Sequence, residues 1–165
     1  MLPQSSSHLS LASKTARTDA RAPLRVITIL RGIPGAVTMP LPLFASRVPA
    51  GFPSPADDYV DQRLDLNTHL VEHPAATFFT RVSGHSMRGA GIHDGDLLIV
   101  DRALEPQDGR IVIAAVNGEL TVKRLRLRSS GAWLVPEHPD YKPLKITEGL
   151  DCVIWGVVTR VIHAV

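Results

Sequence analysis

The chain has 165 residues, 44% of them apolar, and a formal net charge of +2, which is typical of one domain with a real core plus an extension. It contains no run of eighteen apolar residues, so no membrane span is predicted. The single cysteine, Cys152, cannot form an internal disulfide, is expected to be a small buried hydrophobe, and fits a cytoplasmic protein.

The basic residues are concentrated near the N-terminus. Residues 1–50 contain six Lys and Arg residues and one acid, Asp19, so the other residues together carry a net charge of −3. No aromatic stripe or helix-turn-helix pattern accompanies these arginines. We therefore expect no direct, sequence-specific binding to DNA.

Residues 1–38 are predicted to be a basic extension that is either disordered or assigned from a start codon upstream of the true one. Residues 1–24 are rich in Ser, Thr and Ala and show no periodicity, which is typical of disorder, although an organelle transit peptide has a similar composition. Translation from Met39 would remove the whole extension. Within it, residues 25–30 are apolar enough for a short strand.

Residues 39–56 form a proline-rich arm. Proline fixes φ and removes an N–H donor, so the arm is expected to be extended and poorly paired. An extended chain is what a protease cleft accepts, and the Ala50–Gly51 bond lies between small residues with Val48 and Phe52 nearby. On composition alone, a plain linker is the simpler interpretation.

A short helix is predicted after the arm, over residues 68–73, with Asn67 as its N-cap and Pro74 ending it. His69 and His73 have the i, i+4 spacing of some zinc ligands. The sequence offers no third ligand nearby, and the glutamate that zinc proteases place beside the first histidine is absent. We expect a solvated helix face, with no metal and no cofactor.

Residues 57–165 are predicted to be a compact, mainly all-β domain. The Asn117-Gly118 pair is the strongest hairpin signal in the sequence, and it predicts that the strand over residues 120–127 pairs with the strand over residues 111–116. Residues 136–150 contain three prolines and are expected to be a loop. Five or six strands at this spacing indicate a closed or sandwiched sheet. The expected strands are residues 77–82, 97–100, 111–116, 120–127, 132–135 and 152–165.

Ser86 follows the first of these strands. The turn Ser83-Gly84 delivers it to the start of a glycine-rich loop, residues 89–91. A serine hydroxyl just past a strand end, among backbone N–H groups freed by glycine turns, suits a nucleophile with an oxyanion site. Such a serine needs a base.

Lys123 is the candidate base, because it interrupts an apolar alternation. The period of two puts it on the same face as Leu125 and Leu127, and burial lowers the pKa of a lysine. To be mostly neutral at pH 7, the pKa must fall from about 10.4 by roughly 3.4 units, or about 4.6 kcal/mol. The alternative is a lysine at a strand edge that extends its ammonium group to water.

These motifs together resemble the LexA/UmuD family of Ser–Lys self-cleaving peptidases (peptidase S24 type), and most closely its UmuD-like members. The resemblance covers roughly residues 39–165. One departure is His85, which stands where an acidic residue or methionine is usual. The matching segments, in order, are residues 50–55, 65–67, 83–87, 91–101 and 120–123.

The resemblance implies a catalytic mechanism. Ser86 would be the nucleophile and Lys123 its base, while the backbone N–H groups of His85 and Ser86 would form the oxyanion site. The bond cleaved would be Ala50–Gly51, 35 residues before Ser86, leaving residues 51–165 as the product. Because His85 would contribute only its backbone N–H, its identity does not affect the dyad.

The resemblance also implies a role in the SOS response to DNA damage. Cleavage would be stimulated by the RecA–single-stranded-DNA filament, and the processed homodimer would assist an error-prone, UmuC-type Y-family polymerase in translesion synthesis. Three alternatives were open on sequence: a Ser–Lys signal peptidase, a self-cleaving repressor-like regulator, and a non-catalytic interaction module of the same fold. The sequence shows neither the membrane anchor expected of the first nor the DNA-binding domain expected of the second. The third would lose or misplace Ser86 or Lys123, and both are present.

Overall fold

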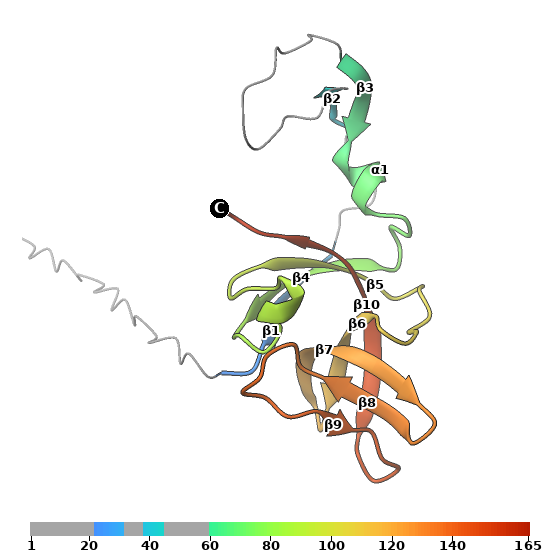
Figure 1. Cartoon of the computed structure of the whole chain (residues 1–165). Helices are drawn as coiled ribbons and strands as arrows, with labels where there is room; N and C mark the ends of the chain where they lie inside the picture. The colour runs from blue at the N-terminus through green and yellow to red at the C-terminus, as the bar shows by residue number, and fades with distance from the viewer. Residues whose placement is uncertain (1–21, 32–37, 45–59) are drawn as a thin grey trace, which may run out of the picture.

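The computed structural model describes residues 22–31, 38–44 and 60–165 of the chain. Eight of the ten strands in these residues form one sheet with the order β1-β4-β5-β10-β6-β7-β8-β9, and the other two, β2 and β3, pair in a separate ribbon (Figure 1). The elements are β1 (Arg25–Arg31), β2 (Pro40–Phe44), β3 (Val60–Asp65), α1 (Leu66–Leu70), β4 (Thr77–Ser83), the 3-10 turn η1 (Arg88–Ala90), β5 (Leu97–Asp101), β6 (Ile111–Val116), β7 (Glu119–Arg128), β8 (Gly131–Val135), β9 (Leu144–Lys145) and β10 (Cys152–Ile162).

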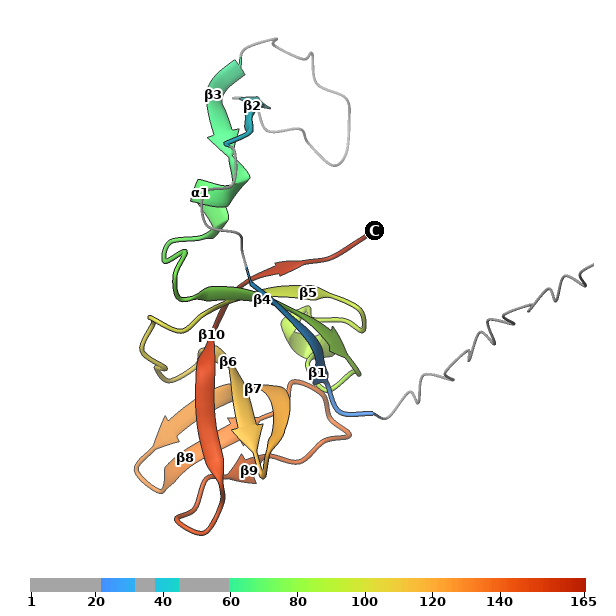
Figure 2. The same cartoon turned by 180° about the vertical axis from the view of Figure 1, so that it is seen from behind.

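The main sheet closes on itself through β1. This strand runs antiparallel to β4 along most of its length, and its first residue, Arg25, also pairs with Thr121 of β7. Figure 2 shows β1 crossing beside β4 toward β7. The closure brings the end of β4 and the middle of β7, which are distant in sequence, to the same part of the molecule.

The long strand β10 joins the two halves of the sheet. Its first half pairs with β6 and its second half with β5, with register shifts at residues 154–156 and 158–160. Gly156 lies at the first shift, where a Cβ atom would approach Val100 Cγ1 to 2.9 Å and the Asp101 carbonyl oxygen to 3.0 Å. Glycine is therefore needed where β10 bends against β5.

Two apolar clusters fill the interior. Val122 and Leu125 of β7 belong to different clusters, so this strand is covered on both faces. The predicted apolar stripe of β7 ends at Leu125, because Leu127 is 49% exposed beyond the covered part of the strand. The first cluster is Leu24, Phe78, Val82, Met87, Ile92, Leu98, Val100, Ile113 and Val122, and the second is Val112, Ala114, Leu125, Leu134 and Val157.

The predicted all-β class is confirmed, and the five strands expected between residues 77 and 135 match β4 to β8 to within one residue at each end. The helix prediction was partly wrong. Helix α1 begins two residues earlier and ends at Leu70, with Asp65 rather than Asn67 as N-cap, because the Asp65 carboxylate accepts the backbone N–H of Asn67. Strands β3 and β9 were not predicted.

Part of the N-terminal region is paired. The expected short strand over residues 25–30 is confirmed as β1, so the structure places residues 22–31 of the predicted extension against the main sheet. The arm is paired at residues 40–44, contrary to the expectation of poor pairing. Its prolines at 40 and 42 alternate, so both missing N–H groups fall on the same edge of β2, and the other edge is free to pair with β3.

The remainder of the arm, including Ala50 and Gly51, lies outside the described residues. Among the helices of the described part of the chain, none has the length and apolar character needed to cross a membrane.

Candidate active site

Ser86 is fully buried in a tightly fixed loop after β4. The loop begins at Gly84, whose φ of +112° is a conformation that favours glycine. The carboxylate of Asp94 accepts the Gly84 N–H at 2.7 Å and the Ser83 hydroxyl at 2.9 Å, and these bonds lower the pKa of Asp94. The loop is also held at Ser86 itself, because the backbone N–H of Glu137 donates to the Ser86 carbonyl at 2.8 Å. A nucleophile in such a loop has one defined position.

Lys123 of β7 reaches the Ser86 hydroxyl. Its Nζ lies 3.1 Å from Ser86 Oγ, 2.9 Å from Thr121 Oγ1 and 2.9 Å from the Val122 carbonyl oxygen. Burial lowers the pKa of Lys123 to about 8. About a tenth of the molecules therefore carry a neutral amine at pH 7, and the fraction rises as the solution becomes alkaline.

The contacts of Lys123 suit a neutral amine. Such an amine has two N–H donors and one lone pair. The Val122 carbonyl can only accept, and the Thr121 hydroxyl donates its own proton to the Leu24 carbonyl at 3.1 Å, so its oxygen accepts from Lys123. As an ammonium, Lys123 donates to all three oxygens. As a neutral amine it uses both N–H groups on Val122 and Thr121, which leaves the lone pair for the Ser86 hydroxyl. This arrangement can remove the serine proton.

One of the two predicted oxyanion donors has a carbonyl partner. The backbone N–H of His85 donates to the carbonyl oxygen of Ala22 at 3.0 Å. The side chain of His85 is buried, and its Nδ1 has no hydrogen-bond partner among the described residues.

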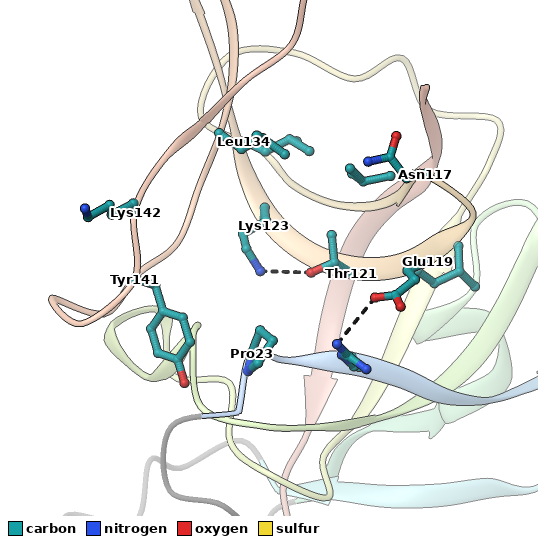
Figure 3. Close-up of a pocket in the computed structure, with 12 residues that line it drawn as sticks. Pro23, Asn117, Glu119, Thr121, Lys123, Leu134, Tyr141 and Lys142 are labelled. Atoms are coloured by element: carbon teal, nitrogen blue, oxygen red, sulfur yellow. Dashed lines mark hydrogen bonds and ion pairs between the residues drawn. The ribbon is translucent and has the colours of Figure 1, made fainter. Parts of the chain in front are cut away.

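A cavity of about 540 Å³ opens beside Lys123. Figure 3 shows Lys123 and Thr121 side by side on β7, facing Pro23, with Tyr141 beyond. An ion pair of 3.4 Å between Arg25 and Glu119 closes one side. The lining residues are Pro23, Arg25, Val116, Asn117, Glu119, Leu120, Thr121, Lys123, Leu134, Tyr141, Lys142 and Leu144.

The sequence prediction that Ser86 and Lys123 are neighbours agrees with this geometry, whereas Ala50 and Gly51 lie outside the described residues. His69 and His73 do not fall in a metal-type cluster of the described residues. Instead, His73 Nδ1 lies 2.6 Å from Asp101 Oδ2, and this bond raises the pKa of His73.

Sequence reasoning missed Thr121, Tyr141 and Leu24 as residues of the site. Thr121 had a usable signal, because the period of two puts it on the same face of its strand as Lys123. The Leu24 N–H reaches Ser86 Oγ, and the Tyr141 hydroxyl reaches the Ala22 carbonyl, only through contacts between distant parts of the chain, which no local pattern indicates.

Residues 42–159 match the family described as Peptidase S24-like. The chain belongs to this family. The predicted LexA/UmuD-type membership is thereby confirmed, and the S24-like match begins beyond β1, so residues 22–31 lie outside it.

Three similar proteins each match about three quarters of this chain. Protein ImpA of Escherichia coli is 56% identical over 123 residues, which are 74% of this chain and 83% of that protein. Protein MucA of Escherichia coli is 48% identical over 121 residues, 73% of this chain and 82% of that protein. The LexA repressor of Acidithiobacillus ferrooxidans is 43% identical over 126 residues, 74% of this S24-like chain and 60% of the repressor.

Proposed function

We propose that this S24-like chain is a serine endopeptidase that cleaves itself, with Ser86 as nucleophile and Lys123 as general base. The observation that carries the proposal is the 3.1 Å contact between Lys123 Nζ and Ser86 Oγ in a site where burial lowers the lysine pKa to about 8. The family match supports peptidase chemistry in general.

The reaction begins when neutral Lys123 takes the proton of Ser86 as Oγ attacks the carbonyl carbon of Ala50. The backbone N–H groups of His85 and Ser86 stabilise the oxyanion of the tetrahedral intermediate. Its collapse breaks the bond to Gly51, and Lys123 returns the proton to the leaving nitrogen. Water, activated by Lys123, then hydrolyses the ester on Ser86, which gives residues 1–50 and 51–165.

The biological role that we propose is SOS mutagenesis. The resemblance to UmuD-like proteins supports a processed homodimer that serves an error-prone Y-family polymerase of the UmuC type. On the same basis, the RecA–single-stranded-DNA filament favours the conformation in which the arm is seated in the cleft. Desolvation by the seated arm keeps Lys123 neutral at lower pH.

A self-cleaving regulator related to repressors is the second candidate, since the LexA repressor shares 43% identity over 126 residues. A repressor would bind an operator through a dedicated DNA-binding element. Operator-independent binding to a Y-family polymerase, measured in a pull-down with purified partners, favours the mutagenesis role. Tight binding to one DNA sequence favours the regulator.

Intact-mass spectrometry tests the proposed activity. The chain is incubated at about pH 10, and at pH 7 with activated RecA filament, beside the Ser86→Ala variant. We expect two fragments divided between Ala50 and Gly51 in both conditions, and none from Ser86→Ala. An uncut chain after long incubation in both conditions would contradict the proposal.

A further inference from the structure

Residues 22–25 lie across the nucleophile. The backbone N–H of Leu24 donates to Ser86 Oγ at 3.0 Å, and the Leu24 carbonyl accepts from the Thr121 hydroxyl at 3.1 Å. From Arg25 onward the segment continues as β1, antiparallel to β4. This is an extended strand bound by main-chain hydrogen bonds, which is how a peptide is held in a cleft of this kind.

The carbonyl of Ala22 is bound by the oxyanion donor. It accepts the backbone N–H of His85 at 3.0 Å and the hydroxyl of Tyr141 at 2.8 Å. The approach is close, because a Cβ atom at Gly84 would lie 2.3 Å from the carbonyl oxygen of Pro23 and 2.7 Å from that of Ala22. The same His85 N–H is the donor expected to bind the scissile carbonyl oxygen during cleavage.

Leu24 fixes the segment from the other side. Its side chain is 0% exposed and packs in the first apolar cluster with Val82 and Met87, which flank the nucleophile loop. Burial of this side chain stabilises the bound segment, because it removes apolar surface from water. The cleft therefore has an apolar pocket two residues beyond the bound carbonyl.

The sequence of this segment parallels that of the cleavage site. Ala22-Pro23-Leu24 and Ala50-Gly51-Phe52 both place a small residue first, a proline or glycine second and a large apolar residue third. The difference is at the second position. Proline has no N–H, and its ring nitrogen would have to act as the leaving group under steric hindrance from the pyrrolidine carbons.

We propose that residues 22–25 are a pseudosubstrate, which occupies the cleft in the register of residues 50–53 and is not cut because of Pro23. The cleft thus selects an extended segment with a small residue at the bound carbonyl and a large apolar residue two positions later. This inference rests on the proposed self-cleavage. The arm reaches Ser86 only in the fraction of molecules whose cleft is empty, so the pseudosubstrate slows cleavage at Ala50–Gly51.

The sharpest test converts the pseudosubstrate into a substrate. In Pro23→Gly, Ser86 Oγ can attack the Ala22 carbonyl carbon, the bond to residue 23 breaks, Lys123 protonates the new amine, and water hydrolyses the ester. Pro23 is exposed, so the substitution spares the core. We expect a new fragment ending at Ala22, and none in Pro23→Gly combined with Ser86→Ala. Cleavage at Ala50–Gly51 without cleavage after Ala22 would overturn the pseudosubstrate.

A second test needs no cleavage at all. In a Lys123→Ala background, which keeps the Ser86 hydroxyl, a fluorescent peptide of residues 45–56 is titrated against Leu24→Asp and against Ile27→Asp. Ile27 lies on the same strand but is 56% exposed, so it is the matched control. We expect Leu24→Asp to bind the peptide at least about tenfold more tightly than the control, because its cleft is empty. Equal affinities would overturn the inference.

The two tests separate the proposals. If the wild-type chain is never cut, self-cleavage fails, while the peptide titration still decides whether residues 22–25 occupy the cleft. If Pro23→Gly is cut only at Ala50–Gly51, and Leu24→Asp binds the peptide no more tightly than Ile27→Asp does, self-cleavage stands and the pseudosubstrate fails.

A separate cluster, on the far side of the Ser86 loop, has the composition of a metal site. His93, Asp96 and His163 each offer a ligand atom, and all three atoms lie within 4.8 Å of one another. The Asp96 carboxylate is 4% exposed and lies 2.7 Å from His163 Nδ1 and 3.9 Å from His93 Nδ1. The two imidazole rings are 4.9 Å apart between centroids.

We also infer that this cluster binds Zn²⁺. Two imidazole nitrogens and one carboxylate oxygen, with water as a fourth ligand, are a known zinc set with metal–ligand distances of about 2.0–2.2 Å. Small rotations of the half-exposed histidines bring their nitrogens to these distances. The ion would join the segment after β10 to the turn before β5, whose Gly95 and Asp96 backbones hydrogen bond to Val82.

Calorimetric titration with zinc alone tests this site. We expect one ion per chain in the wild type, and an affinity reduced roughly tenfold or more in His93→Ala and in His163→Ala. His69→Ala, an exposed histidine of α1, is the matched control and should bind as the wild type does. Wild-type affinity in both cluster variants, or no binding by any chain, would overturn the site.

Discussion

Lys123 Nζ lies 2.9 Å from Thr121 Oγ1, two residues earlier on the same face of β7. The Thr121 hydroxyl donates in turn to the Leu24 carbonyl at 3.1 Å. Thr121 therefore links the proposed base to the strand in the cleft. Its contact with the reacting groups is to the nitrogen of the base, so its role is to position Lys123.

Removing this hydroxyl in Thr121→Val should affect the pH profile in a particular way. The lysine loses one acceptor of its N–H groups, so the ammonium form is less stable and the pKa of Lys123 falls further. We expect the plateau rate of self-cleavage to fall about tenfold, because the amine is less well oriented, while the midpoint of the profile moves to lower pH. Rates from pH 6 to 11, measured by densitometry of the cleaved fragments, give both values.

The control for this change is Thr159→Val. Thr159 lies on β10, and its hydroxyl donates to the Ile99 carbonyl of β5, so the change removes an equivalent hydroxyl that does not bind Lys123. We expect an unchanged midpoint and plateau. A Thr121→Val profile that matches this control would show that Thr121 does not position the base.

Replacement of Lys123 itself should abolish cleavage. In Lys123→Ala no group at the site can take the serine proton, and in Lys123→Arg the guanidinium stays protonated at any useful pH. We expect no fragment from either variant, corresponding to a rate reduced at least about a thousandfold. Lys145→Ala, on β9, is the control and should cleave normally. Residual cleavage by Lys123→Ala that depends on Ser86 would mean that another group acts as base.

The sequence contains most of this site but not all of it. The Asn117-Gly118 turn and the period of two predict that Lys123 lies inside the sheet, and the glycine turn predicts an exposed backbone around Ser86. The 3.1 Å contact between them is a tertiary result of sheet closure, and on sequence it followed only from the family resemblance.

The parts that were missed have physical reasons. Strand β9 has two residues and β3 is mostly polar, so neither has a recognisable apolar period. Residues 25–30 were expected to form a strand, but the burial of Leu24 depends on packing against residues more than fifty positions later in the chain. Such contacts leave no local pattern in the sequence.

Gly156 is the clearest stability prediction. In Gly156→Ala the new methyl group meets Val100 Cγ1 at 2.9 Å and the Asp101 carbonyl oxygen at 3.0 Å, and the backbone of β5 cannot easily withdraw. We expect a loss of about 1–3 kcal/mol in the free energy of unfolding. Urea denaturation followed by tryptophan fluorescence measures it. Gly149→Ala, where a Cβ atom meets nothing within 4 Å, should stay within about 0.5 kcal/mol of the wild type.

The last prediction is the pH dependence of both cleavage and stability. The pKa of Lys123 in the folded chain is about 8, below its ordinary value of 10.5, because burial disfavours the ammonium form. Below pH 8 most molecules carry the ammonium form, which has no lone pair for the Ser86 proton, so the rate of spontaneous cleavage should rise about tenfold per pH unit and level off above the pKa. A rate that is flat between about pH 7 and 10 would contradict the assignment of Lys123 as base.

The same shift fixes the sign of the stability change. Between pH 8 and 10.5 the unfolded chain binds a proton on Lys123 that the folded chain has lost, so the free energy of unfolding should increase with pH across this window. The gain is at most roughly 3 kcal/mol. The free energy of unfolding is measured in a Ser86→Ala chain, which cannot cleave itself. The same measurement in a chain that also carries Lys123→Met is subtracted, which removes the contribution of all other titrating groups. If the difference between the two chains does not change from pH 7 to 11, Lys123 has an ordinary pKa, and the pH dependence proposed for cleavage loses its basis.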